Sequence, residues 1–268
     1  MLDTVGLVDM ALRGELGADP ESISVTGSWS TVQRSAHVGR AEVYRNTVLS
    51  LRAGCVVGSC SVEADELPQT EVDDCAGRTL AELLGHERVA IRIAALVAYL
   101  GLAVPHERQP GVDTVVIPGG TTLEKSVYRA RRVVGLLNPQ PGMRVALVGV
   151  VNSLILALRG LGADCLPCDF NIGQTEWGDP VSQSWAEVIE NADAVLATGM
   201  TVSNGSFDPL LVRARDRDIP GAVYAQTGSA IVPRFLGQGV TGVAAEPFPF
   251  FSLHSGPTTI YLYRSCLA

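Results

Sequence analysis

Residues 144–149 of this 268-residue chain read Arg144-Val145-Ala146-Leu147-Val148-Gly149, a short apolar run closed by glycine. Such a run, ended by a turn residue, is typical of a strand that is buried on both faces. A helical pattern follows at 153–161, and a second strand pattern follows at 164–169. The succession of strand, helix and strand predicts a βαβ unit with parallel strands.

The same alternation continues toward the end of the chain. We expect strands at 194–198, 222–226, 240–244 and 258–263, the last at a sheet edge, with helices at 182–191, 207–217 and 231–236. Short helices between strands indicate an α/β fold with a doubly wound, mostly parallel sheet of the Rossmann-like kind.

The first 106 residues follow a different pattern. A leading helix is expected at 3–16, strands at 22–29, 46–52 and 55–62, a loop at 64–74, and helices at 79–84 and 87–100. Strands first and helices afterwards are typical of a small α+β unit. The segment 104–111 holds two prolines and is the best linker, so we predict two domains, 1–106 and 107–268.

Composition limits the class of protein. Twenty basic and 28 acidic residues give a net charge of −8, so we expect no nucleic-acid partner. The apolar run 145–158 is interrupted by Asn152 and Ser153 and is shorter than the roughly 20 residues of a membrane span, so no membrane partner is expected. The start lacks a signal pattern, which predicts a cytoplasmic protein with six reduced cysteines.

Polar loops of small residues follow four of the predicted strands. In an open parallel sheet, ligands bind beyond the carboxyl ends of the strands, near the point where the strand order reverses. The residues expected to bind a ligand there are Gly149, Asn152, Ser153, Asp169, Thr198, Thr201, Asn204, Gln226, Thr227 and Ser229. Helix capping uses the same residue types and is the competing interpretation.

A further polar turn precedes a helix at Gly120 and Thr121. It predicts either an anion-binding nest or an entry loop with a threonine cap. Lys125, just inside that helix, is the only lysine, so any Schiff-base mechanism would have to use it. A surface lysine is the simpler interpretation.

The loop that follows the strand at 144–149 limits the kind of ligand. Asn152 and Ser153 stand where a pyrophosphate-binding loop needs glycine, which argues against NAD or FAD held in the usual way. Asp169 ends the next strand, where a carboxylate commonly accepts ribose hydroxyls. An adenosyl ligand such as S-adenosylmethionine fits this arrangement, although an Asp after a strand is also an ordinary turn former.

Candidates for proton transfer and metal binding are scattered. His86 and Glu87 at a helix start and His254 in a late loop are the acid–base candidates. Cys165 and Cys168 have CxxC spacing, but their sulfurs point to opposite faces of a strand, and buried inert thiols are the simpler interpretation. Cys168 beside Asp169 is the candidate ligand for a divalent transition metal.

Several motifs together resemble one family. They are Arg144–Gly149, Gly162-Ala163-Asp164 leading to Asp169, the run 191–201, Asn204-Gly205-Ser206-Phe207-Asp208 and the loop 226–230. This order is similar to that of the Rossmann-like proteins described as heavy-metal chelation domains. Members carry an N-terminal domain that resembles the N-terminal part of enolase, and segments 75–83 and 87–100 are similar to its helices.

The resemblance implies two domains with a ligand cleft between them, and a homodimer. Tyr99 stands where the family has asparagine, and Gln226-Thr227 stands where the family has Gly-Pro. Both positions are expected to face the cleft, which leaves open whether the family's ligand is kept.

Two functions of different classes remain open. The favoured one is an enzyme of small-metabolite biosynthesis, with transferase or lyase chemistry in the cleft and an adenosyl ligand held by Asp169. The alternative is a binding protein that chelates a heavy metal or metal complex without catalysis, with Cys168, Asp169, Asn204 and His86 as candidate ligands.

Overall fold

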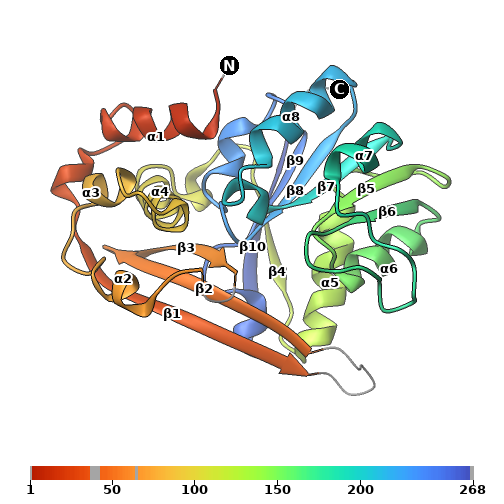
Figure 1. Cartoon of the computed structure of the whole chain (residues 1–268), viewed down its shortest axis with the longest axis horizontal. Coiled ribbons are helices and arrows are strands. Elements are labelled where there is room, and N and C mark those ends of the chain that lie inside the picture. The colour runs from red at the N-terminus through yellow and green to blue at the C-terminus, as the bar shows by residue number, and fades with distance from the viewer. Residues whose placement is uncertain (1, 37–42, 64–65, 266–268) are drawn as a thin grey trace.

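Two β-sheets form the framework of the protein (Figure 1). The structure is a computed structural model that describes residues 2–36, 43–63 and 66–265. The first sheet is antiparallel and holds β1 (Val25–Ala36), β2 (Val43–Ala53) and β3 (Val56–Val62) in that order. The second sheet has seven strands and begins with β4 (Asp113–Ile117). The predicted α/β class, with a mostly parallel sheet and a smaller antiparallel unit, is confirmed.

The seven strands lie in the order β4-β10-β9-β8-β7-β5-β6. The five parallel strands are β5 (Arg144–Val148), β6 (Asp164–Cys168), β7 (Ala194–Thr198), β8 (Gly221–Ala225) and β9 (Gly242–Ala245). β6 lies on one side of β5 and the later strands lie on the other, so the strand order reverses between β5 and β7. In sheets of this kind, that reversal marks the crevice where ligands bind.

The prediction of an edge strand at the end of the chain is wrong. β10 (Thr258–Arg264) is antiparallel to both neighbours and lies between β4 and β9. The outer partner β4 follows the two-proline segment, and only one of its five residues is buried. Its apolar run, 115–117, is only three residues long, which is too short to predict a buried central strand.

Helices cover both faces of the large sheet. α5 (Thr122–Val134) and α6 (Asn152–Gly160) share a core with Val145 and Leu147 of β5. α7 (Trp185–Glu190) and α8 (Phe207–Asp216) share the other core with Ala146 and Val148. Because side chains alternate along a strand, these two sets of helices lie on opposite faces. Three-residue and four-residue 3-10 segments complete the connections: η1 (Pro20–Ser22), η2 (His106–Arg108), η3 (Gly199–Val202), η4 (Val232–Phe235) and η5 (Phe251–Leu253).

Four helices belong to the N-terminal part: α1 (Thr4–Leu12), α2 (Gln69–Asp73), α3 (Leu80–Leu84) and α4 (Val89–Ala103). α2 corrects the prediction of a continuous loop at 64–74, of which residues 64 and 65 lie outside the described residues. α4 packs on β3, and its buried residues belong to the same core as those of α8. One hydrophobic core therefore joins the small sheet to the large one.

One helical run in the described part, Val89–Arg108, is long and apolar enough to cross a membrane, with a mean hydropathy of 1.7. Inside the protein, 61% of its most apolar window is buried. A helix that is apolar on all sides is expected at the centre of a core, and α4 occupies that place.

The close approach of α4 to β3 generates a stability prediction. A Cβ at Gly58 would lie 2.0 Å from the Ala94 carbonyl oxygen and 2.5 Å from the Ala98 amide nitrogen. Gly58→Ala therefore forces the helix away from the strand, and we expect a loss of about 3 kcal/mol in the free energy of unfolding. Urea denaturation measures it.

Gly27→Ala is the matched control, since a Cβ at Gly27 of β1 meets nothing within 4 Å. Equal midpoints for Gly58→Ala and the unaltered protein would contradict the packing described for α4 and β3.

Candidate functional site

The small sheet lies against the loops at the carboxyl ends of the parallel strands. Three hydrogen bonds join them: Asn171 Nδ2 to Glu63 Oε1 (3.3 Å), the Ser61 amide to Thr227 Oγ1 (2.8 Å) and Gln33 Nε2 to the Ser252 carbonyl (3.2 Å). The Trp29 ring also meets the Phe248 ring edge to face, at 6.0 Å between centroids. They reach the loops after β6, β8 and β9. The small sheet thus partly covers the carboxyl ends of the parallel strands.

Gly149 stands at the reversal of strand order. Its φ is +89°, and a Cβ there would lie 2.6 Å from Thr198 Cγ2 and 2.8 Å from Tyr224 Oη. The Tyr224 hydroxyl donates a 2.6 Å hydrogen bond to the Gly149 carbonyl. Only glycine fits this turn, which brings the loop after β5 close to β7 and β8.

Asp169 organises the loop after β6. One carboxylate oxygen accepts from the Val150 amide at 2.9 Å, and the other accepts from the Asn171 amide at 2.9 Å. The next residue, Phe170, leaves 51% of its surface exposed. Farther along the same loop, Glu176 Oε2 accepts a 2.6 Å hydrogen bond from Asn152 Nδ2 at the start of α6. The end of β6 therefore combines a fixed carboxylate with an exposed aromatic ring.

Four of the predicted ligand-binding residues are buried, and three of them form hydrogen bonds within the protein. Thr201 donates to the Thr198 carbonyl (2.7 Å), Thr227 accepts from Ser61, and Ser153 bonds the Ser126 hydroxyl (2.8 Å); Ser229 is 1% exposed. The side chain of the exposed Asn204 accepts from the amide and hydroxyl of Ser206 before α8. Thr198 caps η3 by accepting from the Met200 amide, whereas α6 and α8 begin without a side-chain cap.

The turn before α5 is occupied by groups of the protein itself. The Gly120 amide donates to the Ser255 carbonyl at 2.8 Å, and the Thr121 amide donates to Glu124 Oε2 at 2.9 Å in a capping box. The bonds from Thr121 lower the pKa of Glu124. An internal carboxylate already fills the place expected for an anion, which favours the interpretation as a capped entry loop.

Lys125 is not the surface residue that its type predicts. It is 1% exposed, and its Nζ donates to the His254 carbonyl (2.9 Å), the Gly256 carbonyl (2.6 Å) and Thr258 Oγ1 (2.8 Å). Desolvation lowers its pKa. Three acceptors use all three ammonium donors, so Lys125 holds the loop before β10 against α5.

The acid–base candidates lie in two separate places. His254 is exposed in the loop that Lys125 holds, and its Nδ1 accepts from the Gly256 amide at 3.0 Å. His86 and Glu87 lie between α3 and α4, where their carbonyls accept from Arg92, and α3 is at the far side of the molecule from β5 and β6 (Figure 1). His37 lies outside the described residues.

Tyr99 does not face the strand-end loops. It is buried in α4, and its hydroxyl donates to the Ala18 carbonyl at 3.0 Å, in the segment between α1 and η1. Gln226 does lie at the strand ends, because its Nε2 donates to Glu246 Oε2 at 3.2 Å. Of the two departures from the family pattern, Gln226 alone is placed to contact a ligand there.

A buried charged pair escaped the sequence prediction. Arg129 of α5 and Glu246, the residue after β9, form an ion pair at 2.6 Å with 4% and 2% of their side chains exposed. The Arg129 guanidinium also lies over the rings of Tyr224 (5.2 Å) and Phe251 (5.3 Å). Glu246 directly follows β9, so the expectation of functional residues at the carboxyl ends of the strands indicates it. Nothing in the sequence indicates that Arg129 is its partner.

The thiols are poor candidates for metal binding in this conformation. Burial raises the pKa of Cys168 to about 11 and that of Cys165 to about 12. Across residues 2–36, 43–63 and 66–265, no group of three or more His, Cys, Asp or Glu side chains could hold a metal ion. The five cysteines in this part of the chain are free thiols.

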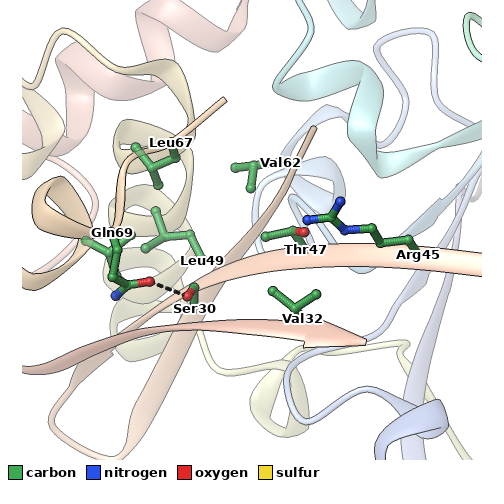
Figure 2. A pocket seen from close by; sticks show the side chains of 9 residues that line it. Ser30, Val32, Arg45, Thr47, Leu49, Val62, Leu67 and Gln69 are labelled. Atoms are coloured by element: carbon green, nitrogen blue, oxygen red, sulfur yellow. Dashed lines mark hydrogen bonds between the residues drawn. The ribbon is translucent and has the colours of Figure 1, made fainter. Parts of the chain in front are cut away.

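One cavity lies on the small sheet, away from the strand ends. It measures about 160 Å³ and lies between β1, β2 and α2. Figure 2 shows Gln69 and Ser30, which share a 2.6 Å hydrogen bond, at one end and Arg45 near Thr47 at the other. Because side chains alternate along β1, this face is opposite to that of Trp29, which meets the large sheet.

Comparison with known proteins bears on the second half of the chain. Residues 132–221, which include β5, β6 and β7, match the family model DUF364, described as "putative heavy-metal chelation". The predicted resemblance is confirmed. Among curated proteins, none matches the chain.

A solved structure of a DUF364 protein from Pyrococcus horikoshii covers 96% of this chain and 98% of its own, with a TM-score of 0.54 and 15% identity. That likeness shows the fold alone. Two other structures are more distant. A mitochondrial aspartate aminotransferase from Trypanosoma brucei has a TM-score of 0.42 and 15% identity, and the match covers 62% of this chain and 48% of that one. A mandelate racemase/muconate lactonizing protein from Herpetosiphon aurantiacus has a TM-score of 0.38 and 10% identity, and the match covers 92% of this chain and 99% of that one. Both scores are too low to indicate a shared function.

The buried ion pair generates a second prediction. Arg129→Met leaves the Glu246 carboxylate without its partner in the interior, and we expect a loss of about 3–5 kcal/mol in the free energy of unfolding. Arg129→Met combined with Glu246→Gln removes both charges and should recover most of that loss. Chemical denaturation of four proteins, the unaltered one, Arg129→Met, Glu246→Gln and the double variant, measures the coupling.

Arg213→Met is the matched control, because Arg213 and Glu190 form an ion pair on the surface with 42% and 48% of their side chains exposed. We expect little change in its midpoint. Strictly additive effects of the two substitutions at Arg129 and Glu246 would show that the pair is not coupled.

The thiols generate a third prediction. At pH 8 and without denaturant, iodoacetamide should label the exposed Cys55 well before Cys60, Cys165 or Cys168, because burial hinders access and a raised thiol pKa keeps the reactive thiolate scarce. Peptide mapping by mass spectrometry gives the order. Labelling of Cys168 as fast as Cys55 would mean that this thiol is accessible and could serve as a metal ligand.

Proposed function

We propose that this protein is an enzyme of small-metabolite chemistry that binds a nucleoside-containing ligand, such as S-adenosylmethionine, at the carboxyl ends of β5 and β6. The observation that carries the proposal is the pairing of the Asp169 carboxylate with the exposed ring of Phe170 beside the reversal of strand order. We take the large sheet as Rossmann-like for this purpose, since β6-β5-β7-β8-β9 follows the 2-1-3-4-5 order of doubly wound sheets.

Asp169 has the capacity for a ribose. A carboxylate offers about four lone-pair sites, and the amides of Val150 and Asn171 use two of them. The remaining two would accept the two ribose hydroxyls. The amide bonds hold the carboxylate in one orientation, so little conformational entropy is lost when the ligand binds.

Phe170 supplies the second contact. An aromatic ring that is half exposed next to a ribose-binding carboxylate offers a flat apolar surface on which a purine base can stack. At Gly149 the backbone itself lies against the Thr198 side chain at the end of β7, since a Cβ there would be 2.6 Å from Thr198 Cγ2. The adenine and ribose would therefore lie along the loop after β6.

Proton transfer in this proposal falls to His254. It lies at the same end of the sheet, because Lys125 binds its carbonyl while the neighbouring Ser126 binds Ser153 at the start of α6. Its Nδ1 accepts an amide hydrogen bond, so the neutral ring carries its proton on Nε2 and can donate it. We assign no role in the chemistry to His86 or Glu87.

The family description favours a second candidate, binding of a heavy metal as a complex with an organic ligand. The described part of the chain offers no cluster of metal-ligating side chains, so the protein would recognise the organic part of such a complex. The same strand-end loops would serve for this. Free thiols agree with a reducing, cytoplasmic location for either function.

A fourth prediction tests the nucleoside site. Phe170→Ala removes the stacking surface without touching the hydrogen bonds of Asp169, and we expect about tenfold weaker binding of S-adenosylmethionine, since base stacking contributes about 1–3 kcal/mol. Isothermal titration calorimetry measures the affinity. Leu156→Ala, at a residue of α6 that is 44% exposed, is the matched control and should bind as the unaltered protein does.

Failure of the unaltered protein to bind S-adenosylmethionine and adenosine would overturn the nucleoside ligand. Native mass spectrometry of the freshly purified protein then separates the candidates. An adduct that contains a transition metal and is lost with a chelator would support the metal complex.

A further inference from the structure

A second cavity lies where the segment 104–110 crosses η4 and the end of β10. It measures about 190 Å³. Tyr263, one of its lining residues, pairs with Val243 near the start of β9, whereas the proposed nucleoside site lies beyond the ends of the parallel strands. The cavity is therefore at the opposite end of the sheet and belongs to a different site.

One wall of this cavity carries a positive charge that the protein does not neutralise. Arg234 of η4 lines it, and the Arg234 Nε is buried without a hydrogen-bond partner among the described residues. The acidic residue next to the cavity, Glu107, accepts from the Tyr261 hydroxyl instead and does not line it. The Arg234 side chain as a whole is partly exposed and forms no ion pair with a described residue. Its terminal guanidinium nitrogens are therefore the groups that an anion in the cavity would contact.

The remaining polar groups of the wall are neutral. His106 Nδ1 and the Tyr263 hydroxyl share a 2.6 Å hydrogen bond, and the His106 ring stacks on Tyr261 at 4.9 Å between centroids. Burial lowers the pKa of His106 to about 4 and raises the pKa of Tyr263 to about 12. Since neither is charged near pH 7, Arg234 is the one charged side chain among the lining residues, which matches a ligand with a single negative charge.

The apolar part of the lining consists of Val104, Pro110, Ala230, Pro233 and Leu236. An apolar cavity of about 150 Å³ in another protein accommodates benzene, so this one has room for a ring or a short branched chain. Gln109, also in the lining, adds an amide that can bond a second oxygen.

We propose that this cavity is a binding site for a small monocarboxylic acid, with the carboxylate on Arg234 and the apolar body against Pro233 and Leu236. The site is independent of the proposed nucleoside site. A guanidinium is the side chain best suited to a planar carboxylate, because two of its parallel donors can bond both oxygens.

Benzoate is the probe, and benzamide is its neutral counterpart of the same shape. By calorimetry we expect benzoate to bind the unaltered full-length protein with a dissociation constant of about 1 mM or tighter and benzamide to bind at least tenfold more weakly. Arg234→Met keeps most of the side-chain volume and should weaken benzoate binding at least tenfold. Arg132→Met, at an exposed arginine of α5, should leave it unchanged.

Three results would overturn the proposal: no binding of benzoate, equal affinity for benzoate and benzamide, or unaltered affinity in Arg234→Met. If Arg234→Met does not fold, the comparison of benzoate with benzamide on the unaltered protein decides. The amide resonances of 104–110 and 230–236 should shift on addition of benzoate; shifts confined to the strand-end loops would place the ligand elsewhere.

Discussion

The free edge of β3 is the constraint on which the arrangement of the two sheets depends. An edge strand presents unpaired amides, and burial makes each of them costly unless an acceptor is found. The Ser61 amide finds its acceptor in Thr227 Oγ1, in the loop after β8. Together with the contacts of Asn171, Gln33 and Trp29, that bond holds the small sheet over the strand ends. It also commits the Thr227 hydroxyl, so in the loop after β8 we expect ligand contacts from Gln226.

How far the sequence could predict the fold follows from the period of its apolar residues. β5 and β7 are continuous apolar runs, buried on both faces, and their bounds are close to those predicted. β4 is mostly exposed, and its apolar run of three residues, 115–117, is too short to predict a strand. Without β4 as an expected partner, the sequence predicts β10 at an edge. The apolar pattern reports burial of a segment; it does not report which strand lies beside it.

The candidate site was less predictable because its residue types serve two purposes. Serine, threonine and asparagine at strand ends cap helices as readily as they bind ligands, and the choice depends on partners far away in the chain. Thr201 and Asn204 bond residues two or three positions away, while Thr227 bonds a residue 166 positions away. Arg129 and Glu246, 117 residues apart, carry no local signal of their pairing at all.

The protonation of the thiols and the hydrogen bonds of the carboxylates distinguish the two candidate functions more clearly than the residue types alone. A metal site needs thiolates or clustered carboxylates and imidazoles. Here burial keeps the Cys168 thiol protonated, and the carboxylates of Asp169, Glu124 and Glu246 already accept internal hydrogen bonds. Among these three, Asp169 alone combines partial exposure with free lone pairs and a neighbouring aromatic surface. We therefore propose that the strand ends accept hydrogen bonds from an organic ligand, either a nucleoside or the organic part of a metal complex.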